Sequence, residues 1–338
     1  MAETQRQIAV ALKVSQVTVS RALRGEAGVS ERLRLRILKE AKRTGYSLEA
    51  SFAARHMRHQ GLGRTVQTNV ICAILPGDLD DHSFTGRMLR GISAEGPRQG
   101  SEVVYITQAI DDLPRVVQRR QVDGVIRILG DIQVLQGHTD CPVPWVSVLF
   151  DVPGADLVTI DQAAGCRELG QHLGRLGHRR VAFIGPQSDL SSERLAGARA
   201  GLKAAGGKMP PELILIAPYA ANEIDTRNFV DRLVAMRAQH PFTAVVAYND
   251  WMAVHAVQRL RHHGLRVPED ISVTGFDGAL PAAFQLVRMT TAAIPLEDLG
   301  IEAVRTLCWR LANPDAGRRR VMLQTTMIQG DTTAPASR

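Results

Sequence analysis

The sequence predicts an N-terminal all-α head followed by an α/β body of two lobes with parallel, doubly wound sheets. Three observations predict this fold class. Residues 4–24 contain two short helical patterns joined by a tight turn, the arrangement of a helix-turn-helix. From about residue 69, continuous apolar runs alternate with helical patterns, which is typical of parallel α/β sheets. The charge is uneven, because residues 1–64 carry 13 Lys or Arg and 5 Asp or Glu, whereas the remainder carries 28 and 29.

The head is expected to contain three helices. Thr4 can cap the first and Ser15 the second, since each precedes an amphipathic segment. Ser30 can cap a third, basic helix. Apolar positions that recur at helical spacing predict the core of the head, which comprises Ile8, Ala9, Leu12, Val19, Ala22, Leu23, Leu33, Ile37 and Ala41.

The second helix leaves a polar face directed outward. Gln16 can pair with adenine, Arg21 with guanine, and Val17 can contact a thymine methyl group. A basic module on a near-neutral body is the electrostatic pattern of nucleic-acid binding. Most arginines of the third helix are expected to be solvated. The residues expected to contact double-stranded DNA, at bases or at phosphate oxygens, are Thr4, Ser15, Gln16, Val17, Thr18, Ser20, Arg21 and Arg24.

The body shows a regular alternation of strands and helices. Continuous apolar runs predict strands buried on both faces at 70–75, 102–106, 124–128, 144–148, 181–184, 213–216, 244–247 and 271–274. Helices are predicted between them at 86–99, 163–176, 194–205, 226–239 and 251–263. Two such blocks, divided near residue 160, predict two lobes with a cleft between the carboxyl ends of their strands.

Several of these segments resemble the lactose-repressor (LacI/GalR) family of bacterial transcription regulators. In the head, the shared pattern is Val-Ser-x-x-Thr-Val-Ser-Arg at 14–21, with Ile8-Ala9, Val29-Ser30 and Gly45-Tyr46 around it. In the body, the likeness continues through 176–184, 192–197, 248–253 and 264–277. It implies a periplasmic-binding-protein-like body behind a DNA-binding head. The family usually has Gly where Lys13 stands, and a left-handed backbone there would cost Lys up to about 1 kcal/mol.

The resemblance also implies how the chain is divided. The expected units are a DNA-binding head at 1–46, a hinge at 47–64, and an effector-binding and dimerisation domain at 65–338. Within that domain the N-lobe is expected at about 69–160 and 293–320, and the C-lobe at about 161–291 and 322–338.

In the family, a hinge residue wedges into the minor groove of DNA. The motif match puts this residue at Met57, whereas the spacing from Tyr46 puts it at Arg55. Because an apolar side chain can kink a base step, Met57 is the favoured wedge.

Polar residues at the ends of strands are the candidate ligand groups. Arg194 begins a helix at the lobe junction and can fork onto a ligand oxygen. The resemblance puts Arg194, Asn249 and Asp277 at the family's effector contacts, and Asp151 at a fourth. Asn249 can also cap a helix. The remaining effector-contact candidates are His82, Ser83 and Phe84 on the loop after the first strand, and Tyr219, which supplies either an aromatic face or ordinary packing.

Two residues of the body depart from the surrounding pattern. Ile294 is apolar where the family often has Gln, and it cannot hydrogen-bond a hydroxyl group. Arg127 lies inside an apolar strand, where it could reach the cleft or pair at a dimer face.

These features together predict a transcription regulator acting as a repressor. We expect a homodimer that binds a near-palindromic operator and responds to a sugar or related metabolite between the lobes. We expect a cytoplasmic bacterial protein, nucleoid-associated when bound to DNA, with no transmembrane helix, because no run of 18 apolar residues occurs. No metal or cofactor is expected, since the four cysteines are scattered.

The sequence argues against two other classes of protein. An enzyme is disfavoured, because the body has no Gly-x-Ser-x-Gly elbow, phosphate loop or metal cluster. A DNA-architectural protein without an effector is the alternative, and a complete two-lobed body argues against it.

Overall fold

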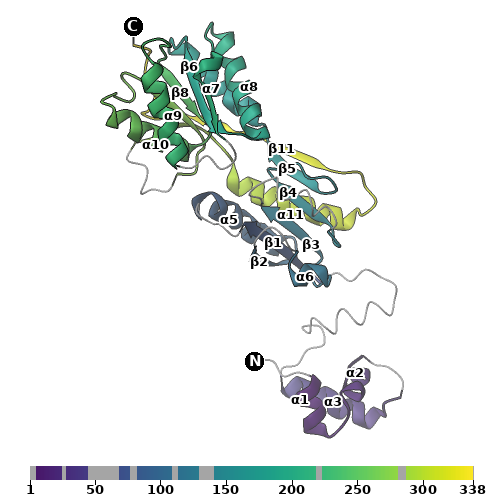
Figure 1. Ribbon diagram of the computed structural model, residues 1–338. Coiled ribbons are helices and arrows are strands. Elements are labelled where there is room, and N and C mark those ends of the chain that lie inside the picture. Colours follow the sequence, from purple (N-terminus) through teal and green to yellow (C-terminus); the bar gives the residue numbers. More distant parts are fainter. Residues whose placement is uncertain are drawn as a thin grey trace.

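The structure, a computed structural model, describes residues 5–24, 28–44, 68–76, 82–108, 113–128, 141–217, 223–280 and 287–337. Figure 1 shows a helical head, in purple, and a body made of two α/β lobes. The predicted fold class is confirmed. In the described residues, no helix is both long and apolar enough to cross a membrane.

Three helices form the head around a small apolar core. They are α1 (Gln5–Leu12), α2 (Gln16–Arg24) and α3 (Glu31–Arg43). Each helix contributes a fully buried residue to this core, namely Ile8, Val19 and Ile37. Their packing agrees with the apolar spacing of the sequence. Ser30 stands at the start of α3, but its side chain makes no capping hydrogen bond, so that part of the prediction is wrong.

The turn between α1 and α2 has the left-handed backbone expected at Lys13. The φ angle of Lys13 is 54°, and the amide of Val14 donates to the carbonyl of Ala9 at 3.0 Å. This hydrogen bond closes the carboxyl end of α1. Ser15 then caps α2, because its Oγ accepts from the amide of Thr18 at 3.0 Å.

The N-lobe contains a six-stranded parallel sheet in the order β11-β5-β4-β3-β1-β2. Its strands are β1 (Val70–Pro76), β2 (Glu102–Gln108), β3 (Gly124–Ile128), β4 (Trp145–Val148), β5 (Asp156–Ile160) and β11 (Arg320–Leu323). Helices α5 (His82–Arg98) and α11 (Leu296–Ala312) cover one face, and the short α6 (Arg115–Gln118) lies on the other. β5, β11 and α11 were not predicted. The two strands contain runs of only two and three apolar residues, whereas charged residues interrupt the apolar residues of α11.

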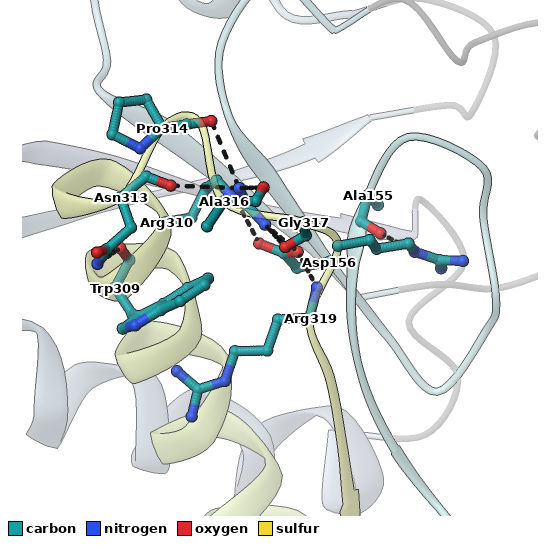
Figure 2. Close-up of polar contacts among 10 residues, drawn as sticks. Ala155, Asp156, Trp309, Arg310, Asn313, Pro314, Ala316, Gly317 and Arg319 are labelled. Atoms are coloured by element: carbon teal, nitrogen blue, oxygen red, sulfur yellow. Dashed lines mark hydrogen bonds and ion pairs between the residues drawn. The ribbon is translucent and has the colours of Figure 1, made fainter.

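A loop after α11 is fixed to the amino edge of the N-lobe sheet. Arg310 forms a bidentate ion pair with Asp156, with distances of 2.7 and 2.8 Å. The same guanidinium donates to backbone carbonyls of the loop at 313–317, which brings the loop beside the start of β5 (Figure 2). The backbone amide of Arg319 also donates to Oδ1 of Asp156, at 2.7 Å.

The C-lobe repeats the same sheet order with one antiparallel edge strand, β12-β10-β9-β8-β6-β7. Its strands are β6 (Val181–Pro186), β7 (Ile214–Ala217), β8 (Ala244–Ala247), β9 (Ser272–Asp277), β10 (Thr290–Ala293) and β12 (Thr326–Ile328). Its helices are α7 (Gln162–Arg175), α8 (Asp189–Ala204), α9 (Glu223–Met236) and α10 (Asp250–His262), with a 3-10 turn at Pro211–Leu213. Sequence analysis did not identify β10 or β12, which are short and rich in threonine.

Helices α7 and α8 approach so closely that only glycine fits between them. A Cβ at Gly197 would lie 2.1 Å from the carbonyl oxygen of Ala163, and one at Gly201 would lie 2.0 Å from that of Arg167. α8 begins at Asp189 and not, as predicted, at Arg194, which lies in its second turn. The packing fixes this part of α8, and therefore Arg194, against the start of α7.

The chain passes between the two sheets three times. The passages follow β5, β10 and β11, and the last lies between Leu323 and Thr326. Since Arg320–Leu323 pairs with β5, the N-lobe sheet extends a few residues beyond the expected passage near 321. Buried residues of both lobes, including Ile160, Phe276 and Leu296, form one continuous apolar cluster.

Candidate functional site

The outward face of α2 presents the residues expected to read DNA. Gln16, Val17 and Arg21 are exposed, and Val17 leaves 61% of its surface accessible. Thr18 and Ser20 are half-buried. The hydroxyl groups of Ser15 and Thr18 lie 2.8 Å apart, so Ser15 acts at the helix cap and orients Thr18.

Several expected DNA and ligand contacts cannot be placed. Thr4, Arg55, Met57 and Tyr219 lie outside the described residues. The backbones of Arg24, His82 and Ser83 belong to α2 and α5, but their side chains are outside the description.

Arg194 is the centre of a buried polar cluster at the carboxyl edge of the C-lobe sheet. Its side chain is 5% exposed. Nε donates to Oε1 of Gln162 at 2.8 Å, Nη1 to the carbonyl of Tyr248 at 2.6 Å, and Nη2 to Oδ1 of Asp277 at 3.3 Å. Every nitrogen therefore has an acceptor, as a buried guanidinium requires.

Two aromatic rings hold the same guanidinium. Its Cζ lies 4.4 Å from the ring centroid of Tyr248 and 3.8 Å from that of Phe276. A cation between two ring faces is attracted to both quadrupoles, and the rings keep water from it. Arg194 is thus held rigidly before any ligand arrives.

Asp277 combines a rare backbone conformation with an accessible carboxylate. It ends β9 with a φ of 108°, a region that favours glycine, and its side chain is 16% exposed. The carbonyl of Asp277 accepts from the amide of Ile294 at 2.9 Å, which ties this turn to the passage after β10. Backbone outliers of this kind concentrate at binding sites.

Asn249 and Asp250 support this site from the start of α10. Oδ1 of Asn249 caps the helix by accepting from the amide of Met252 at 2.9 Å, which commits one of the two lone pairs of this oxygen. Asp250 is buried, and its Oδ2 accepts from the amides of Gly278 and Ala279 at 2.7 and 3.3 Å. Burial raises the pKa of Asp250 to about 6.

The structure separates Asp151 from the Arg194 cluster. Asp151 is exposed and pairs with Arg318 at 2.5 Å and with Arg320 at 3.8 Å, beside the amino end of β11. A cavity of about 610 Å³ lies at that edge, lined by Trp145, Arg310 and Arg318 among others. All its lining residues belong to the N-lobe, so it is distinct from the Arg194 cluster.

Three other residues singled out in the sequence are buried or half-buried. Phe84 is half-buried in α5 and packs against the core. Ile294 is 2% exposed and belongs to the apolar cluster. Arg127 is buried in β3, on the sheet face that Val125 shares with α6, and burial lowers its pKa.

Known proteins share both this architecture and its order along the chain. Residues 171–333 match the family model described as a periplasmic binding protein-like domain. The HTH-type transcriptional regulator Rv3575c of Mycobacterium tuberculosis is 30% identical over 361 residues, covering 98% of this chain and 97% of its own. The HTH-type transcriptional repressor CytR of Escherichia coli K12 is 27% identical over 350 residues, with the same coverage of 98% and 97%. A solved complex of the transcriptional regulator CelR with cellobiose has a TM-score of 0.65, at 25% identity, and the match covers 98% of this chain and 99% of that one.

The chain belongs to the LacI/GalR family of transcription regulators. Its relatives are regulators of transcription and not enzymes, and the same holds for this chain. The head and the two-lobed body are those of the family.

Three residues of the cluster around Arg194 were not predicted as site residues. Gln162, Tyr248 and Phe276 contact the guanidinium. Gln162 begins α7, Tyr248 directly follows β8, and Phe276 is the last residue but one of β9. Tyr248 and Phe276 stand immediately before Asn249 and Asp277, so their position in the sequence was the available signal. Gln162 carried no comparable signal, because its partner is 32 residues away.

Proposed function

We propose that this family member is a dimeric repressor whose affinity for a near-palindromic operator is set by a small metabolite between the lobes. The observation that carries the proposal is the ion pair between Arg194 and Asp277, prearranged at the carboxyl edge of the C-lobe sheet beside the chain passage that follows β10. The exposed face of α2 supplies the complementary contact with DNA.

The chemistry of the cluster favours a polyhydroxylated ligand. A partly exposed carboxylate accepts hydrogen bonds from hydroxyl groups, and a fixed guanidinium donates to ring or hydroxyl oxygens. The cellobiose in the CelR complex is a ligand of this type. We therefore infer a sugar, or a metabolite that carries a sugar, as the effector.

Control of DNA binding follows from differential affinity. An effector that contacts Asp277 and reaches the N-lobe binds one lobe arrangement more tightly than another, and so changes the population of each. In a dimer, a change in the lobe arrangement alters the distance and orientation between the two heads, each of which binds one half of the operator. The protein would act in the cytoplasm, where its operator lies.

The test is a selection of genomic fragments by the purified full chain, with and without sugars, sugar acids and nucleosides. We expect enrichment of one near-palindromic sequence, and a change in its affinity with at least one compound. Enrichment that no compound alters would favour the effector-independent architectural protein. Retention of random duplex as strongly as any genomic fragment would overturn the proposal.

A further inference from the structure

A side chain of the N-lobe reaches the backbone of the C-lobe beside Asp277. Arg87 lies on α5, one turn after Phe84, and is half-buried. Its Nη1 donates to the carbonyl oxygen of Gly278 at 3.0 Å. Because α5 belongs to the N-lobe and Gly278 follows β9 of the C-lobe, this hydrogen bond joins the lobes independently of the three chain passages.

The C-lobe holds Gly278 in a single orientation. Its amide donates to the buried carboxylate of Asp250 at 2.7 Å. Its φ is +66°, and a Cβ at this position would lie 2.5 Å from the Cβ of Ala293. Only glycine satisfies both conditions, so the direction of the Gly278 carbonyl toward Arg87 is fixed by the C-lobe.

Asp277, the residue before Gly278, supplies the carboxylate of the proposed ligand site. Asp277 pairs with Arg194 at 3.3 Å, and one planar peptide joins Asp277 to Gly278. The carbonyl that Arg87 binds belongs to the next peptide, between Gly278 and Ala279, whose amide donates to Oδ2 of Asp250 at 3.3 Å. A shift of the Asp277 backbone therefore reaches this carbonyl through the backbone of Gly278.

We propose that Arg87 is a positioning residue that couples the Asp277 site to the arrangement of the two lobes. The inference rests on the proposed function for the meaning of that coupling. Arg87 joins the lobes through its hydrogen bond to the carbonyl oxygen of Gly278. The backbone conformation of Asp277 determines whether that oxygen lies within reach of Arg87. A ligand that alters the Asp277 backbone therefore strengthens or weakens a contact between the lobes without touching the N-lobe itself.

The first test needs no ligand, so its failure is distinguishable from failure of the proposed function. Fluorescent dyes are attached through unnatural amino acids at two exposed positions, Gln118 in α6 and Lys203 in α8 of one protomer of the full chain. The distribution of distances between them is measured by single-molecule energy transfer. Removing a hydrogen bond to a charged donor in Arg87→Ala should raise the population of altered lobe separations about tenfold.

The matched control is Arg90→Ala, three residues along the same helix. Arg90 is 66% exposed on its side chain and lies 4.0 Å from Glu297 of the same lobe. This variant should keep the distance distribution of the unaltered chain. Arg87→Lys retains a cationic donor and should restore part of the original distribution, which separates loss of the contact from misfolding.

Coupling to the ligand site is tested by combining two changes. Asp277→Ala should also alter the distribution, and adding Arg87→Ala to it should have less than the additive effect, because both act through Gly278. A distribution unchanged by Arg87→Ala would overturn the proposal, as would fully additive effects of the two changes.

Discussion

Arg194 and Asp277 meet across 83 positions of sequence, with 3.3 Å between Nη2 and Oδ1. The arginine is closed in by Tyr248 and Phe276, whereas the carboxylate keeps part of its surface accessible. The two charges therefore have unequal roles. Arg194 orients the site from within, and Asp277 is the group that a ligand can reach.

Replacing Asp277 should separate ligand response from DNA binding. In Asp277→Ala, we expect specific operator binding to persist, at an affinity shifted by the altered distribution of lobe arrangements, and the response to the effector to disappear. Operator titration, with and without a compound that alters the affinity of the unaltered chain, measures both. Asp331→Ala is the control, because Asp331 forms an exposed pair with Arg288. A normal response in Asp277→Ala would remove Asp277 from the site.

Arg21 should contribute to specificity more than to general attraction for DNA. It is exposed on α2, and loss of a bidentate contact with guanine costs about 1–3 kcal/mol. Arg21→Ala should weaken operator binding by about that amount and change affinity for random duplex far less. Fluorescence anisotropy with both duplexes provides the comparison. Arg43→Ala removes the same charge from α3, where Arg43 pairs with Glu40, and should lower both affinities alike.

The ion pair between Asp156 and Arg310 should be important for the stability of the N-lobe. The two side chains are 2% and 13% exposed, and Arg310 also binds the loop at 313–317 (Figure 2). Asp156→Ala leaves a buried guanidinium without its partner, which costs about 3 kcal/mol. Asp270→Ala is the control, since Arg266 and Asp270 form an exposed pair of similar geometry, and exposed pairs contribute less than about 1 kcal/mol. Equal losses in urea unfolding would contradict this account.

Lys13→Gly should stabilise the head. Lys13 holds a φ of 54°, and relief of that conformation is worth up to about 1 kcal/mol. Hydrogen exchange of the amides of α1 and α2 in the full chain measures the change, with stronger protection expected. Lys39→Gly places the same substitution in the interior of α3, where it should lower protection. Weaker protection in Lys13→Gly would show that the lost side chain matters more than the turn.

Two buried histidines should make the C-lobe less stable in mild acid. Nε2 of His178 donates to the carbonyl of Ala334 at 3.1 Å, and Nδ1 lies 2.8 Å from the hydroxyl of Thr243. Nε2 of His172 lies 3.0 Å from the hydroxyl of Thr333. Burial lowers the pKa of both histidines below the ordinary value. The unfolded chain therefore binds protons first, and stability should fall as pH drops through about 6.5.

Thermal unfolding between about pH 7.5 and about pH 5.5 tests this dependence. His178→Gln keeps a donor and an acceptor but cannot titrate, so its melting temperature should fall less steeply with pH than that of the unaltered chain. His262→Gln changes an exposed histidine and should leave the slope as it was. A slope that His178→Gln does not alter would assign the acid sensitivity to other groups.

The local elements of this protein could be predicted from its sequence. The head follows from apolar positions such as Ile8, Val19 and Ile37, because helical periodicity is written into neighbouring residues. The left-handed turn at Lys13 follows from the family resemblance, because the family usually has Gly at this position. Each of the eight apolar runs forms a strand, but the edge strands β2 and β7 are not buried on both faces as predicted, since Val104, Tyr105 and Ile216 are exposed.

Tertiary structure alone decided how distant residues meet. Tyr248, Phe276 and Gln162 surround Arg194 because the sheet order and the α7–α8 packing bring four segments to one edge. Asp151 ends a predicted strand as Asp277 does, yet the chain turns back after β4 and carries it to the opposite edge. The spacing of residues along a chain encodes helices and strands. Which strand ends become neighbours depends instead on the packing of whole layers. Short segments such as β11 and β12 contain too few apolar residues to reveal their place in that packing.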